Sequence, residues 1–316
     1  MTDVATRAQV SLLAHLLGTE TDTLADLERL GAEGVKALRK FMSDEIYDHL
    51  APTFARVSKL APLVPNAVVV SIALKAVPPE VAGRAGGAVG RDHKDRATAI
   101  LSGLTADYLA DAAPYVDPRL IPHFVPAIDA SALIPAAKEL LRRGDYLTAS
   151  LFVEFADEQL IHEFENAIDD DEGILRTAAL VSSTDQLNQI MRVASPARRS
   201  RMIMAAAASG GQSFAAALSL LSRLDPEFSV PLGAEMFGSA DADRTAELIR
   251  NAVVACAAAE LLDAIDNLGD DHLQRVVATN VFADEPIRRA AESAADTDRR
   301  RRALLRVETV SRIRIG

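Results

Sequence analysis

The stretch that decides the fold is ADEQLIHEFENAI, residues 156–168. Its apolar side chains Leu160, Phe164 and Ile168 stand four residues apart, so they form one stripe along a helix. Asp157 precedes the stripe, and an aspartate side chain can cap the free amides at the start of a helix. The stretch therefore predicts a short amphipathic helix, which needs a neighbour to cover its apolar stripe.

The same pattern recurs along the chain, which indicates an internal repeat. Its first apolar position is held by Ile46, Val81, Leu120, Leu160 and Leu273, the position four residues later by Leu50, Ala85, Phe124, Phe164 and Val277, and the position eight residues later by Phe54, Val89, Ile128, Ile168 and Val281. The first four copies stand 35, 39 and 40 residues apart, and the last gap leaves room for two degenerate copies. Second helices are predicted near Thr105, Asp145 and Thr184, and Phe124 and Phe164 are expected to be buried between helices.

Helix pairs of this length become stable by stacking on their neighbours. Because strand patterns are rare as well, we predict an all-α fold, an α-solenoid of stacked helix pairs with a repeat of about 35–40 residues. Three parts are expected: N-terminal capping helices (1–41), a helical-repeat solenoid (42–285), and a C-terminal helix with an arginine-rich tail (286–316).

The openings Pro78-Pro79-Glu80-Val81 and Asp157-Glu158-Gln159-Leu160 belong to a repeat that resembles the helical intracellular N-terminal domain of MgtE-type magnesium transporters. The resemblance covers residues 42–285 and implies a superhelix of short helices. Nothing in the sequence matches the regulatory module or the membrane domain of that family. Transport and magnesium gating therefore do not carry over, and no functional residue is transferred.

Composition restricts the class of protein further. The chain has 316 residues, a net charge of −11, 49% hydrophobic but only 4% aromatic residues, and one cysteine, Cys256. A lone cysteine is typical of a reducing compartment, and no secretory signal is recognisable, so we expect a cytoplasmic protein. The most apolar segment, 60–74, is shorter than the roughly 20 residues of a membrane span and contains Pro62 and Pro65, which predicts a buried helix.

No catalytic, cofactor or metal site emerges from the motifs. The glycines in 83–90 lack the lysine of a phosphate loop and are better explained by close helix packing. His49, His123 and His162 lack the spacing of a helix-borne zinc site, and the acidic run 169–172 lacks the ligand pattern of a calcium loop, so capping of a helix start explains it. Removing divalent metal is therefore expected to leave stability unchanged.

Two arginine clusters are the candidate partner-binding residues. The first consists of Arg198, Arg199 and Arg201, at the start of a predicted helix. The second lies in residues 299–316, which carry +6 against −17 for the rest of the chain, and begins with Arg299, Arg300, Arg301 and Arg302. Apolar residues interleaved among these arginines predict that the tail docks on an acidic surface, either of its own solenoid or of a second copy.

The sequence thus favours a non-enzymatic helical-repeat scaffold that binds a partner protein or its own copy. One alternative is an enzyme or small-ligand-binding module whose pocket is assembled between repeats. The other is a nucleic-acid adaptor that uses the arginine-rich tail, which the acidic body and the few aromatic residues disfavour.

Overall fold

In the part that the structure describes, the chain is built from α-helices and short 3₁₀ segments, of which Thr21–Leu30 is the longest. The computed structural model covers residues 3–315, and the side chains at positions 124, 127 and 312–315 lie outside the description. The helices are α1 (Val4–Leu17), α2 (Gly31–Leu60), α3 (Asn66–Ala76), α4 (Pro79–Asp92), α5 (Lys94–Leu101), α6 (Ala106–Ala112), α7 (Ile121–Phe124), α8 (Ala130–Arg143), α9 (Tyr146–Val153), α10 (Glu158–Ala167), α11 (Asp171–Leu180), α12 (Thr184–Val193), α13 (Pro196–Ser209), α14 (Gly211–Arg223), α15 (Pro226–Gly238), α16 (Ala242–Val254), α17 (Ala258–Asp266), α18 (Asp270–Ala278), α19 (Glu285–Ala294) and α20 (Asp298–Ile315). Helices make up 83% of the chain and no strand occurs among these residues, which confirms the all-α class.

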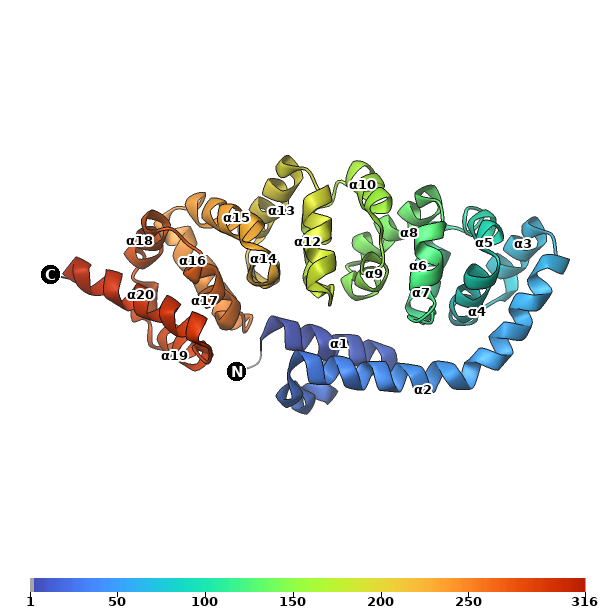
Figure 1. Cartoon of the computed structure of the whole chain (residues 1–316), viewed down its shortest axis with the longest axis horizontal. Coiled ribbons are helices and arrows are strands. Elements are labelled where there is room, and N and C mark those ends of the chain that lie inside the picture. Colours follow the sequence, from blue (N-terminus) through green and yellow to red (C-terminus); the bar gives the residue numbers. More distant parts are fainter. Residues whose placement is uncertain (1–2, 316) are drawn as a thin grey trace.

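The helices from α3 to α20 form one elongated, curved array (Figure 1). Most helices pack on a helix one to three places further along, so that α8, α10 and α12 contact in turn, as do α9, α11, α14 and α17. The second helices expected near Thr105, Asp145 and Thr184 are α6, α9 and α12. The expected helix at Asp157 is α10, and the Asp157 side chain accepts a hydrogen bond of 2.8 Å from the Leu160 amide.

One type of contact recurs between neighbouring helix pairs. An arginine donates hydrogen bonds to the backbone carbonyls at the end of a helix that lies 36 to 44 residues earlier in the chain, and Arg223, Arg244 and Arg306 are examples. Arg223 reaches the Ala179 and Val181 carbonyls, both at 2.6 Å. This separation is close to the spacing of the sequence repeat and favours the solenoid interpretation.

The array is filled in its C-terminal half. One continuous core runs from Leu175 in α11 to Val307 in α20, and Phe214 and Phe237 meet edge to face in it, with ring centroids 6.2 Å apart. Stripe residues Leu273, Val277 and Val281 are all buried here. The predicted apolar stripe therefore belongs to the hydrophobic core in this half of the molecule.

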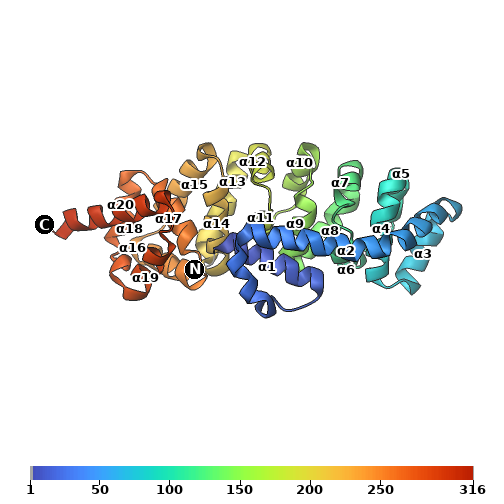
Figure 2. The same ribbon diagram turned by 60° about the horizontal axis from the view of Figure 1, so that its bottom comes forward.

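The N-terminal helices lie along one side of the array rather than stacking at its end. In Figure 2, α1 and α2 run beside the row of helices, and α2 leads to α3 at the far end. α1 contacts α11 and α14, and the Gln9 amide donates a hydrogen bond of 2.9 Å to the Ser182 hydroxyl. α2 runs without interruption across the expected boundary between residues 41 and 42, so the first repeat copy is part of this long helix.

The expectation of a buried helix over residues 60–74 is wrong. This segment forms the end of α2, a short 3₁₀ turn (Ala61–Leu63) and most of α3, and α3 contains no buried residue. The physical reason is position: α3 is the last helix of the array at this end and packs on α5.

The arginine-rich tail forms α20, which packs on α17 and α18 of the same chain. Arg300 donates two hydrogen bonds to the Asp263 carboxylate, at 2.8 and 3.1 Å, and this ion pair is largely buried. Ala303 and Val307 are buried beneath the helix. The prediction that the tail docks on an acidic surface is confirmed, and that surface belongs to the same chain.

Replacing Arg300 with alanine should destabilise the fold by about 2 kcal/mol, because it removes charged hydrogen bonds and leaves Asp263 buried without its partner. Arg301 is the matched control, since its ion pair with Asp298 lies in solvent. Urea unfolding of Arg300→Ala and Arg301→Ala measures both. Equal unfolding midpoints for the two variants would contradict the docking of α20 through Arg300.

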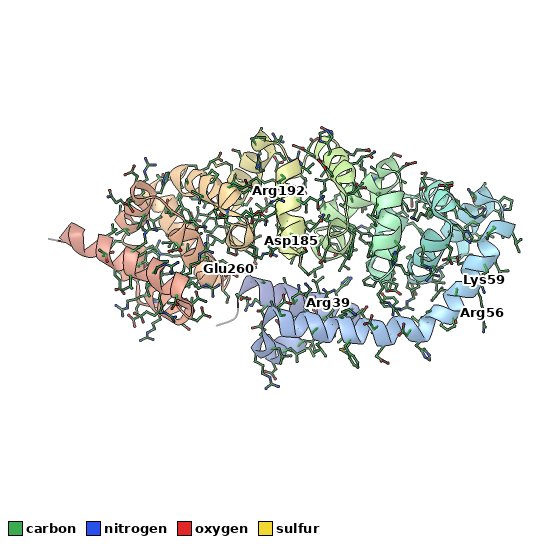
Figure 3. All side chains as sticks on the ribbon, in the orientation of Figure 1. Arg39, Arg56, Lys59, Asp185, Arg192 and Glu260 are labelled. Atoms are coloured by element: carbon green, nitrogen blue, oxygen red, sulfur yellow. The ribbon has the colours of Figure 1, made fainter. Side chains whose placement is uncertain are left out.

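A buried carboxylate ties the start of the chain to the C-terminal half. The Val4 amide donates a hydrogen bond of 2.7 Å to Glu260 Oε1 on α17, and Figure 3 shows Glu260 beside the start of α1. Burial raises the pKa of Glu260 to about 7, and the Val4 hydrogen bond acts in the opposite direction.

Stability should therefore depend on the ionisation of Glu260. Its pKa in the unfolded chain is near the usual 4.5, so the stability that the protonated carboxyl contributes is fully present below pH 4.5 and is lost as the pH rises through about 7. Glu260→Gln cannot ionise, so its stability relative to wild type should be higher at pH 8 than at pH 4.5, by about 3 kcal/mol. Urea unfolding at both pH values tests this. Glu308→Gln, on the exposed face of α20, should show no such pH-dependent gain.

Candidate functional site

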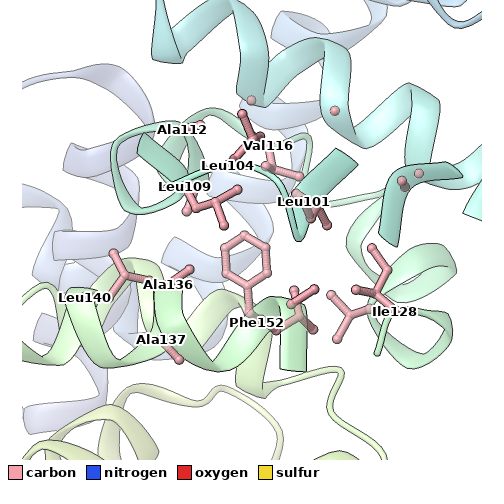
Figure 4. Close-up of a pocket in the computed structure, with 18 of the residues that line it drawn as sticks. Leu101, Leu104, Leu109, Ala112, Val116, Ile128, Ala136, Ala137, Leu140 and Phe152 are labelled. Carbon is pink, nitrogen blue, oxygen red and sulfur yellow. The ribbon is translucent and has the colours of Figure 1, made fainter. Parts of the chain in front are cut away.

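The N-terminal half of the array contains a large cavity between its helices. Its volume is about 580 Å³, within the range of about 300 to 1,000 Å³ that is usual for ligand pockets. Side chains from α2 to α13 line it, so it is elongated along the array. Figure 4 shows Phe152 in its middle section, between Leu109 and Leu101 on one side and Ala136 and Ile128 on the other.

The lining consists almost wholly of alanine, valine, leucine, isoleucine and phenylalanine side chains. The stripe residues of the first four repeat copies that line it are Phe54, Val81, Ala85, Val89, Ile128, Leu160, Phe164 and Ile168. Phe164 is thus half-buried against the cavity rather than fully buried between helices as expected, and the side chain of Phe124 lies outside the described part of the structure. The same stripe that fills the C-terminal core surrounds empty space here.

The deep end of the cavity is closed by a paired arginine. Arg198, only 4% exposed, lies 2.7 Å from Asp171 Oδ1 and donates hydrogen bonds to the carbonyls of Glu165, at 3.4 Å, and of Ile168. Glu165 lies beside Arg198. Burial acts to raise the pKa of the Glu165 carboxyl, but hydrogen bonds from Ser195 and the charges of His162 and Arg198 outweigh burial, so the pKa is lowered. These groups already have partners, so the deep end offers no free charge to a ligand.

The cavity opens at the other end. Five of the residues that line it are exposed, namely Val57, Leu60, Ile72, Val81 and Gly86, and all five lie in α2, α3 and α4. The remaining lining residues are half-buried or buried. A ligand would therefore enter between these three helices and extend toward α13.

The candidate arginines make contacts within the chain. Arg198 is the buried group described above, Arg199 lies over the Phe228 ring at 5.0 Å, and Arg201 pairs with Asp171 at 3.0 Å. On α20, Arg299 and Arg302 approach Asp266 at 3.5 and 3.4 Å. The structure does not bring the two clusters to one site, and burial makes the Arg198 guanidinium unavailable to a partner.

The other motifs have structural roles. Asp170 caps α11 by accepting a hydrogen bond of 2.8 Å from the Gly173 amide, as expected for the acidic run. A Cβ atom at Gly83 would collide with the Ala112 carbonyl, so this glycine lets α4 approach α6. Among the described residues, no cluster of three or more histidine, cysteine, aspartate or glutamate side chains is arranged to hold a metal ion.

Sequence reasoning missed the cavity itself. The stripe predicts which side chains face inward, but the distance between the facing helices depends on the whole array. Side-chain size gives no signal either, because alanine is at least as frequent in the filled core of the C-terminal half as in the lining of the cavity.

Comparison with protein-family profiles, curated proteins and solved structures gives no match to this chain. The resemblance to the MgtE N-terminal domain therefore stays an expectation from the sequence pattern. Within residues 3–315 no helix combines the length and the apolarity needed to cross a membrane.

Filling part of the cavity should stabilise the empty protein. Ala136→Leu adds apolar atoms that point into open space, and we expect a gain of about 1 kcal/mol in the free energy of unfolding. Ala208→Leu, at an exposed position of α13, is the matched control and should leave stability nearly unchanged. A loss of stability in Ala136→Leu alone would mean that this part of the cavity is closed in solution.

Proposed function

We propose that this protein binds an elongated apolar molecule, the hydrocarbon tail of a lipid, in the cavity between its helices. The observation that carries the proposal is the cavity of about 580 Å³ with its nearly uninterrupted aliphatic lining. A small-ligand-binding module is one of the alternatives that the sequence leaves open, and the lining of the cavity adds the chemical class of the ligand. The lining supports a binding protein rather than an enzyme, since its charged side chains, Glu165 and Arg198, are engaged with their neighbours.

Energetics favour an occupied cavity. An empty apolar cavity costs about 24 cal/mol for each Å³, so this volume would cost on the order of 10 kcal/mol. The whole stability of a typical domain is only about 5 to 15 kcal/mol. Water would not relieve this cost, because the lining offers it few hydrogen-bond partners. An apolar ligand restores the missing contacts.

The shape of the cavity favours a chain-like ligand. Neighbouring helices lie about 8 to 10 Å apart, and the cavity passes several of them between α2 and α13. It is therefore long relative to its volume, and a flexible hydrocarbon tail fills such a space better than a compact ring system. A polar head group would remain at the open end, since the deep end holds no free charge.

Partner binding through the arginines has weaker support. Arg198, Arg300 and Arg302 are used in contacts within the chain. Binding of a protein partner or a second copy thus remains a proposal without an observation of its own. The lone Cys256 supports a reducing, cytoplasmic location.

Titration with a polyene fatty acid that fluoresces in apolar surroundings tests the proposal. We expect saturable binding of one molecule per chain. Ala136→Leu should weaken it at least tenfold by occupying the same space, whereas Ala208→Leu should bind as wild type does. Mass spectrometry of an organic extract of the purified protein identifies the native ligand. Fluorescence that never saturates, or that responds equally in both variants, would disprove binding in the cavity.

A further inference from the structure

We propose that the open end of the cavity, formed by α2, α3 and α4, docks on the surface of an anionic lipid membrane, from which the hydrocarbon tail enters. This inference rests on the proposed function, because docking would serve to transfer a lipid tail from the membrane into the cavity. Its evidence is separate: exposed apolar side chains, local charge, and their continuity with the cavity.

Exposed apolar side chains are concentrated at this end. Of the fourteen large hydrophobic residues that are exposed among the described side chains, seven fall within residues 57–81. They are Val57, Leu60, Leu63, Val68, Ile72, Leu74 and Val81. Leu63 is 76% exposed, and α3 is mostly apolar, with Asn66, Ser71 and Lys75 as its polar residues, yet it contains no buried residue. Such a helix at a protein surface is typical of an interaction site.

The charge of this end is opposite to that of the rest of the molecule. Residues 50–105 contain seven basic and three acidic residues, or +4, whereas the whole chain carries −11. Arg56, Lys59, Lys75 and Lys94 are exposed, and none of the four forms an ion pair within the described residues. Figure 3 shows Arg56 and Lys59 projecting from the far end of α2.

The exposed apolar side chains continue into the cavity. Val57, Leu60 and Ile72 are exposed and also line it, so an apolar path leads from the surface of α2 and α3 to the interior. A lipid tail that follows this path would stay out of water along its whole route. Its head group would remain next to Lys59 and its basic neighbours.

An anionic bilayer fits this combination better than a protein does. Apolar side chains that insert below the head groups, flanked by exposed lysine and arginine, are the features of a protein that lies on an anionic membrane. The acidic remainder of the chain would be repelled from such a membrane, which orients the open end toward it. A symmetric pair of copies would bring two basic ends together, and their repulsion opposes that arrangement.

Co-sedimentation with lipid vesicles tests the docking. Wild-type protein should bind vesicles that contain 30% phosphatidylglycerol at least tenfold more tightly than vesicles of phosphatidylcholine alone, and added salt should weaken the binding. Leu63→Asp with Val68→Asp should reduce binding at least tenfold. Neither residue lines the cavity, and both are exposed, so the fold and the cavity should be preserved. Leu305→Asp, at a leucine 60% exposed on α20, is the matched control and should bind as wild type.

The outcomes separate the two proposals. Equal binding of the double variant and Leu305→Asp to anionic vesicles would overturn docking through this end. Docking would also be overturned if the wild-type protein sedimented as a dimer and the double variant as a monomer. The surface would then join two copies of the chain. Fatty-acid titration without vesicles reports on the cavity alone. If the protein binds the fatty acid but not the vesicles, only the docking is rejected. If it binds the vesicles but not the fatty acid, only the proposed function is rejected.

Discussion

The interaction on which the array depends is an arginine guanidinium bonded to the carbonyls that end an earlier helix. Arg96, Arg198, Arg223, Arg244, Arg275 and Arg306 all make it, across 30 to 44 residues of sequence. The last turn of a helix has carbonyls without partners and carries partial negative charge, so a cation with several donors satisfies both needs. Repeated along the chain, this contact links successive helices both where side chains fill the space between them and where they do not.

The two halves of the molecule differ in how completely their interiors are filled. From α11 onward, alanine and leucine side chains with a few phenylalanines and methionines fill the interior, and the core is continuous. Before α11, the buried clusters are smaller, and apolar side chains surround a space that they do not fill. One architecture thus supplies a filled half and a hollow half. The same backbone contacts hold both.

The sequence predicted the helices and the inward stripe because both depend on local spacing and on capping residues such as Asp157. It did not predict the cavity, because side-chain size decides a void only after the distance between the helices is known. It also placed residues 60–74 in the interior, since apolarity alone does not show that α3 is the last helix of the array. The contacts of Glu260 and Asp263 depend on residues far away in the sequence, and no local pattern marks them.

The hydrogen bond between the Val4 amide and Glu260 joins residues 256 positions apart, and it has a consequence for folding during synthesis. Most contacts of the array link neighbouring pairs, so these can form one after another as the chain leaves the ribosome. The first helix is the exception, since the carboxylate that holds its start is made much later. At about 5 to 20 residues per second, the helix waits roughly 10 to 50 seconds for this partner. The start of α1 therefore reaches its final contact only after most of the array has been synthesised.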